Sequence, residues 1–153
     1  MVLSGTSAGG QFHHPGNVNA HSILRTAGRA SADVWAEQIA PLLFGRQYVE
    51  QYPERLQSLA RWRARYPTNP VAIARQWEAW ERFDIGDQLS EIQAPVLVLH
   101  GTDDALSPVV NAEMLVELLP HAELQLLDGI GHSPNVEAPD RFNQAIRDFL
   151  KRT

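Results

Sequence analysis

The clearest pattern of apolar and polar positions lies in the C-terminal third of the chain. Residues 96–101 (VLVLHG) form a short, continuous apolar run, which is typical of a strand buried on both faces. Residues 122–127 (AELQLL) alternate instead, with Leu124 and Leu126 on one face. This alternation predicts a strand nearer the edge of a sheet. The sequence therefore predicts two strands of one sheet in this region.

Helical patterns alternate with these strands. Ser107 as N-cap and Pro108 at the first helical position predict a helix that ends at Pro120. Because a crossover of this length makes the two strands parallel, their carboxyl ends open on the same edge of the sheet. After the second strand, five apolar residues recur at the spacing of a helix packed on a sheet: Phe142, Ala145, Ile146, Phe149 and Leu150.

The middle of the chain is predicted to form a small helical layer. Helices are predicted over residues 33–43, about 48–65 and 70–83, with a break near Gly45. All four tryptophans lie there: Trp35, Trp62, Trp77 and Trp80. Aromatic residues on helices usually belong to a core, but a lid over an apolar pocket uses the same residues, so both interpretations stay open. The arginine-rich residues 61–65 are interpreted as a solvated helix face rather than an anion site.

Length and composition narrow the class of protein. At 153 residues, with 44% apolar and 20% charged residues, we expect one domain with a packed core. The net charge of -5 argues against nucleic acid or an anionic membrane surface as a partner. The absence of cysteine excludes disulfides, thiolate zinc sites and a cysteine nucleophile. No leader or membrane span is predicted, and the cytoplasm is the default location.

Titratable residues follow both predicted strands at their shared edge. The loop HGTDDALSP carries Asp103 and Asp104, and the loop DGIGHSP carries His132. Because neighbouring strands lie about 4.8 Å apart, a carboxylate from one loop can reach the imidazole from the other and fix its tautomer. Either residue alone is more typical of a capped turn or a surface histidine. Their joint position favours an acid/base pair that works near neutral pH.

These same segments resemble a known family. PVLVLHGTDDALSP and GHSPNVEAPDRFNQAIRDFL resemble the last two strand-loop-helix units of the α/β-hydrolase superfamily. In that family a G-x-x-D-x-x-x-P loop provides the triad acid and a G-H loop the base, which implies Asp104 as acid, rather than Asp103, and His132 as base. VLSGTSAGG resembles the sixth strand, and PLLFGRQYVEQYPERLQSLARW resembles the cap helices of the branch with 3-oxoadipate enol-lactonases and related esterases.

The resemblance implies a fold and an activity. The expected fold class is α/β, as the C-terminal part of an α/β-hydrolase: a short parallel sheet flanked by helices, plus a helical cap. Residues 1–153 would form one partial domain, with a sheet core in 1–10 and 88–153 and a cap or lid in 11–87. The implied activity is hydrolysis of a small ester, lactone or related acyl compound by a nucleophile-His-Asp triad, without a cofactor.

A nucleophile is not evident in the sequence. Residues 5–9 (GTSAG) match the pattern G-x-S-x-G, but only four residues precede them and Pro15 soon follows, whereas the motif requires a strand before it and a helix after it. Ser7 is therefore not expected to be the nucleophile. We expect the chain to lack the first five strands of the fold and to be inactive alone. The edge at residues 1–5 would then be exposed, which invites pairing or self-association.

Two other interpretations remain open. His100, Asp103, Asp104 and His132 offer nitrogen and oxygen ligands suited to zinc or manganese, but at no recognisable ligand spacing. The group His13, His14 and His21 is interpreted as part of a polar loop. The stronger alternative is an inactive, truncated hydrolase that serves as a binding or interaction module, in which the exposed strand edge adds to a partner's sheet.

Overall fold

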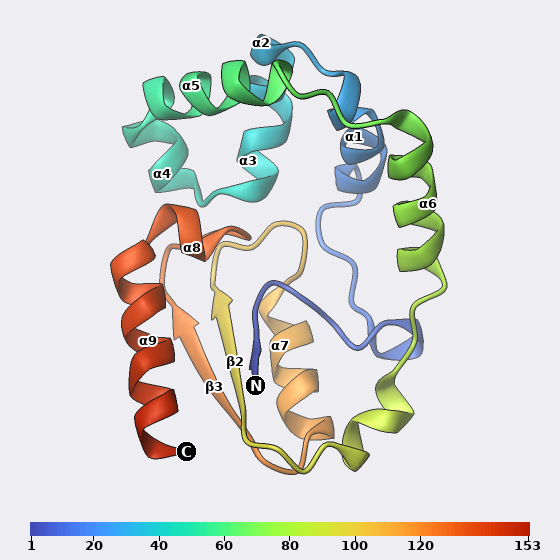
Figure 1. Ribbon diagram of the computed structural model, residues 1–153, viewed down its shortest axis with the longest axis vertical. Coiled ribbons are helices and arrows are strands. Elements are labelled where there is room, and N and C mark those ends of the chain that lie inside the picture. The colour runs from blue at the N-terminus through green and yellow to red at the C-terminus, as the bar shows by residue number, and fades with distance from the viewer.

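A three-stranded parallel sheet lies below a group of short helices in the computed structural model, which describes residues 1–153 except for the side chain of His21 (Figure 1). The strands are β1 (Val2–Leu3), β2 (Val96–Gly101) and β3 (Ala122–Leu127), in the order β1-β2-β3. In the register, Leu97 of β2 lies opposite both Val2 and Glu123. The predicted parallel pair of strands is confirmed, and β2 is its central strand.

Every residue of β2 is buried because helices cover both faces of the sheet. On one face Val96 and Val98 pack in a cluster with α7 (Val109–Leu118). On the other, Leu97 and Leu99 pack with Phe149 of α9 (Pro139–Arg152). Figure 1 shows α7 and α9 on opposite sides of the strands. A strand with two apolar neighbours needs a continuous apolar run, which is the pattern seen in the sequence.

Three details of this region differ from the prediction. Leu124 packs on the α7 face, but Leu126 is exposed because that cluster does not extend beyond Leu124 along β3. Leu150 is likewise exposed near the end of α9. Ser107 is not the N-cap of α7, which begins at Val109 after Pro108. The Ser107 amide is instead held by a side chain of its own loop, so the chain turns into the helix two residues later.

The middle of the chain is helical, as predicted, but in shorter pieces. The α-helices are α1 (Ala20–Thr26), α2 (Ala32–Val34), α3 (Ala40–Leu43), α4 (Arg46–Gln51), α5 (Pro53–Ala64) and α6 (Pro70–Glu81), and α8 (Pro134–Glu137) precedes α9. A π-helical turn spans Trp35–Ile39, and 3-10 turns span Gly10–Phe12, Ala27–Arg29 and Gly86–Glu91. The helix expected over about 48–65 is divided at Pro53, because proline cannot donate the backbone hydrogen bond that would continue α4.

These helices have a core of their own at the end of the sheet to which the strands point (Figure 1). Seven buried residues form it: Trp35, Ile39, Ala40, Phe44, Tyr48, Leu56 and Ala60. By contrast, α6 has no buried residue and contacts α1 at the side of the molecule. Within the part of the chain that the structure describes, no helix has the length and apolar character needed to cross a membrane.

Candidate active site

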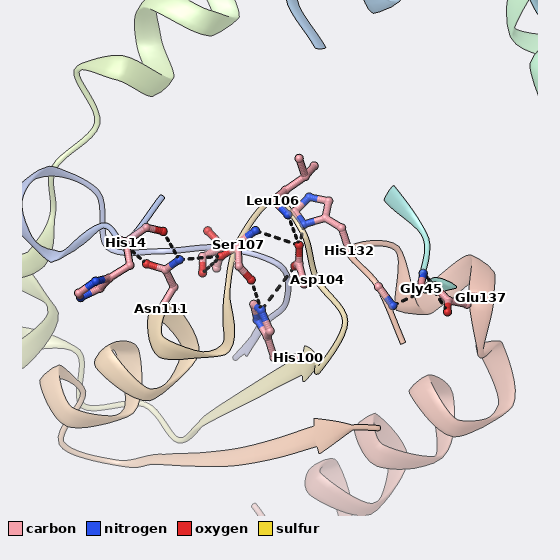
Figure 2. A network of polar contacts seen from close by, with 11 residues as sticks. His14, Gly45, His100, Asp104, Leu106, Ser107, Asn111, His132 and Glu137 are labelled. Carbon is pink, nitrogen blue, oxygen red and sulfur yellow. Dashed lines mark hydrogen bonds and ion pairs between the residues drawn. The ribbon is translucent and has the colours of Figure 1, made fainter. Parts of the chain in front are cut away.

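The structure brings Asp104 and His132 together at the carboxyl edge of the sheet. Asp104 follows β2, and His132 lies in the loop between β3 and α8. The Asp104 Oδ2 atom lies 2.8 Å from Nδ1 of His132 (Figure 2). The Asp104 side chain is 1% exposed and that of His132 is 28% exposed. The carboxylate is therefore enclosed, while the imidazole reaches solvent.

Backbone groups hold the Asp104 carboxylate in place. Its Oδ1 atom accepts hydrogen bonds from the amides of Leu106 and Ser107, each at 2.9 Å. Oδ2 remains for His132, and a carboxylate can only accept, so the pair places a proton on Nδ1 of that ring. In the neutral imidazole this leaves Nε2 unprotonated, as a general base requires.

A second, fully buried histidine lies beneath the same carboxylate. His100 is 1% exposed, and its Nε2 lies 2.7 Å from the carbonyl oxygen of Ser107 and 3.4 Å from Asp104 Oδ2. Because a carbonyl oxygen can only accept, Nε2 carries the proton and Nδ1 does not. His100 Nδ1 has no hydrogen-bond partner among the described residues. From the sequence, His100 was expected only as a candidate metal ligand. A polar residue at the end of an apolar strand is the signal that could have indicated its buried role.

Asn111 of α7 ties a distant segment to this loop. Its side chain is fully buried; Oδ1 accepts from the His14 amide at 2.8 Å and Nδ2 donates to the His14 carbonyl at 2.8 Å. Nδ2 also lies 3.3 Å from Ser107 Oγ. Asn111 was not predicted as a site residue, although a polar residue on the buried face of a helix signals a hydrogen-bonding role.

A cavity of about 730 Å³ opens beside His132. Its walls include apolar residues from α1 and α6 and the segment that follows: Leu24, Ile73, Trp77, Trp80 and Phe83. Polar groups enter it from Ser7, His13, Arg63 and Gln76. Trp77 and Trp80 thus line a cavity, whereas Trp35 belongs to a core.

Ser7 lies on the wall of this cavity but not on an elbow between a strand and an α-helix. Its Oγ lies 3.0 Å from Nδ1 of His13, and it accepts from the Gly9 amide at 3.4 Å. The chain then forms the 3-10 turn Gly10–Phe12. Gly5, with φ of +56°, lies against the His132 ring, and a Cβ atom there would be 3.1 Å from Nδ1. The positive φ and this close approach together favour glycine at position 5.

Asp104 lies between His100 and His132, but the described residues of the alternative metal sites do not form a metal centre. Among the side chains that the structure describes, no group of three or more histidines, aspartates and glutamates is placed to hold a metal ion. Asp103 is a loop residue whose amide donates to the carbonyl of Ile130. His14 binds Asn111 through its backbone, and the side chain of His21 lies outside the described part of the structure.

Comparisons with known proteins point to one family. A family model described as alpha/beta hydrolase fold matches residues 11–139. The putative carbamate hydrolase RutD of Agrobacterium fabrum is 31% identical over 122 residues, covering 80% of this chain and 47% of the relative. The 3-oxoadipate enol-lactonase 2 of Acinetobacter baylyi is 28% identical over 157 residues, covering 92% of this chain and 58% of the relative. The chain thus spans about half the length of these curated relatives.

Solved structures resemble the whole described fold. A thermophilic esterase from Thermogutta terrifontis matches with a TM-score of 0.75 and 27% identity, over 99% of this chain and 55% of the esterase. The enol-lactonase from Burkholderia xenovorans matches with a TM-score of 0.76, over 98% of this chain and 55% of that one. At 24% identity the second likeness concerns the fold alone. The fold predicted from the sequence, a partial α/β-hydrolase with a short parallel sheet, is confirmed.

Proposed function

Because the chain belongs to the α/β-hydrolase family, we propose that Asp104 and His132 are the acid and base of a catalytic triad. The reaction is hydrolysis of a small ester, lactone or related acyl compound. The observation that carries this proposal is the 2.8 Å contact between a backbone-held carboxylate and Nδ1 of His132, which leaves Nε2 as a proton acceptor beside a cavity.

The proposed steps use His132 twice. Its Nε2 takes the proton of a nucleophilic hydroxyl as that oxygen bonds to the acyl carbon, and Asp104 stabilises the resulting imidazolium. The proton passes to the leaving oxygen as its bond to the acyl carbon breaks, which leaves an acyl-enzyme. Water then repeats the sequence: Nε2 takes one proton of the water, and the nucleophile's oxygen receives that proton when the acid departs.

The nucleophile is proposed to come from a segment outside residues 1–153. Two observations support this: Ser7 Oγ is paired with His13, and the chain covers about half the length of its relatives. Residues 11–87 would form the lid, because α1 and α6 supply apolar walls of the cavity, while residues 1–10 and 88–153 would form the sheet part that holds the base.

The names of the relatives support a small acyl substrate. They include a putative carbamate hydrolase, an enol-lactonase and a 2-hydroxy-6-oxononadienedioate hydrolase. Together these names describe hydrolases of small carbonyl compounds. The cavity beside His132, with mainly apolar walls, suits a substrate of this class better than a long polymer.

Ester and lactone hydrolysis by the complete gene product that contains residues 1–153 tests the proposal. We expect p-nitrophenyl acetate or a small lactone to be hydrolysed, and His132→Ala to lower kcat by about 10² to 10⁴. His121→Ala, at an exposed histidine, is the matched control and should leave kcat unchanged. Unchanged activity in His132→Ala would contradict the assignment of the base.

A serine-reactive phosphonate locates the nucleophile in the same samples. We expect labelling of the complete product to persist in Ser7→Ala. Labelling that disappears in that variant would identify Ser7 as the nucleophile. If no substrate is turned over and no residue is labelled, the proposal of hydrolysis fails and the interaction module is favoured.

A further inference from the structure

One carboxylate joins the lid to the loop of the proposed base. Glu137, the last residue of α8, accepts hydrogen bonds from the Gly45 amide at 3.0 and 3.2 Å. Its Oε2 atom also accepts from the Gly131 amide at 3.0 Å. Gly45 lies between α3 and α4, and Gly131 immediately precedes His132. Figure 2 shows this Glu137 bridge beside the His132 loop.

The residue after His132 is fastened to the same lid segment. The Ser133 amide donates to the carbonyl of Leu43 at 3.0 Å. Both chain neighbours of His132 are thus connected to residues 43–45, one through Glu137 and one directly. The position of the imidazole is set from two sides, because its backbone has little freedom left between two such anchors.

The two segments also touch without room for a side chain. A Cβ atom added at Gly131 would lie 2.4 Å from the Gly45 nitrogen and 2.5 Å from the Phe44 carbonyl carbon. Any larger residue at 131 would push residues 44 and 45 away. Close packing therefore transmits a displacement of the lid segment to the backbone beside His132.

The Glu137 carboxyl is half-buried, and within the described part of the chain no lysine or arginine pairs with it. Burial raises the pKa of Glu137, the amides of Gly45 and Gly131 lower it, and the charge of Asp103 raises it again, with a net increase. Partial burial of a carboxylate costs free energy unless hydrogen bonds or a charged partner offset that cost. Its contacts, two backbone amides on different segments, are suited to alignment.

We infer that Glu137 is a positioning residue whose carboxylate couples the place of α3 and α4 to the orientation of the His132 ring. Glu137 is not proposed to touch substrate; it acts through Gly131. This inference rests on the proposed function of His132 as base. It adds that the lid controls the base, because a shift of residues 43–45 moves both backbone anchors of the ring.

Two substitutions of Glu137 test the coupling on the chain itself. Glu137→Ala removes both acceptors, and Glu137→Gln keeps one oxygen but turns an NH2 group toward an amide donor. Because hydrogen bonds to a charged group are stronger than those between neutral groups, Glu137→Ala should speed hydrogen exchange at Gly45 and Gly131 by about 10- to 100-fold, with a smaller change in Glu137→Gln. Glu113→Gln, at an exposed glutamate of α7, is the matched control and should change neither amide.

The decisive measurement is nitrogen NMR of the His132 ring. We expect its Nδ1 proton to exchange faster and its nitrogen signals to shift in both Glu137 variants, with no shift in Glu113→Gln. Faster exchange at Gly45 and Gly131 with an unchanged ring would show a structural role only and overturn the inference. Unchanged exchange at both amides would overturn it too. If Glu137→Ala does not fold, Glu137→Gln gives the answer.

This test is separable from the test of hydrolysis. If the His132 signals shift in the Glu137 variants but activity survives His132→Ala, the coupling is supported and the proposed function is contradicted. If the His132 signals are unchanged in the Glu137 variants but His132→Ala abolishes activity, the proposed function is supported and the coupling is overturned.

Discussion

The sheet and the helical region, residues 20–81, bury their apolar residues in different ways. Every residue of β2 is buried between two helices, so the sheet has a closed core on each face. The helical region has one cluster around Trp35, and α6 contributes nothing to it. Large apolar side chains stay exposed there, among them Trp62 at 58% and Tyr66 at 68%.

This difference in packing indicates which region can hold catalytic groups in place and which can move. A carboxylate and an imidazole must be held within a few tenths of an ångström, and the loops that follow a closed sheet provide that support. Helices with few buried residues open locally at a lower free energy, which suits a lid. The Glu137 bridge joins the two regions at the proposed base, through Gly45 beside the buried Phe44.

A core truncation in β2 should lower the free energy of unfolding more than any other proposed substitution. Leu99→Ala removes a fully buried side chain and should lower the free energy of unfolding by about 2 to 5 kcal/mol. Val71→Ala, at an exposed position of α6, should change it by less than about 0.5 kcal/mol. Urea unfolding measures both. Equal losses in the two variants would remove the distinction between the regions.

Asn111→Ala should have the next largest effect. It removes both hydrogen bonds to the His14 backbone and leaves buried polar groups without partners, which should cost about 2 to 4 kcal/mol. The exposed Asn143→Ala is the matched control. Limited proteolysis should then cut near residues 13–17 before it cuts the sheet. Resistance equal to that of the unmodified chain would show that Asn111 does not hold this segment.

A smaller and more local effect is expected at the start of α6. The Asn69 side chain accepts from the Val71 amide at 2.8 Å, and loss of such an N-cap costs about 1 kcal/mol. In Asn69→Ala, hydrogen exchange should become faster in α6 and stay unchanged in β2. Equal changes in both elements would mean that α6 and the sheet open as one unit.

The smallest effect concerns pH. Burial raises the pKa of Glu137 above its ordinary value of 4.5, so the folded chain binds this proton more tightly than the unfolded chain. That stabilising contribution is complete below pH 4.5 and is lost as the pH rises through the folded pKa. The stability of the unmodified chain relative to Glu137→Gln should therefore fall over this range. Urea midpoints at a series of pH values measure it, and a rise would contradict the direction.

Local patterns predicted the sheet, whereas side-chain bridges between distant segments were not predictable. The apolar run of β2 and the parallel crossover predict Asp104 and His132 at one edge, because period and connection length determine that geometry. The contact of Glu137 with Gly45 spans 92 residues, and no periodicity encodes such a contact. The exposure of Leu126 escaped prediction for a related reason: it depends on where α7 stops covering β3.

Nitrogen NMR of the histidine rings shows whether Asp104 sets the tautomer of His132, and it needs neither a nucleophile nor a substrate. We predict that the neutral ring of His132 carries its proton on Nδ1, whereas His100 carries its proton on Nε2. Asp104→Ala should abolish the Nδ1 preference of His132. A His132 ring protonated on Nε2, or a ring whose signals are unchanged in Asp104→Ala, would contradict the claim that Asp104 prepares His132 as a base.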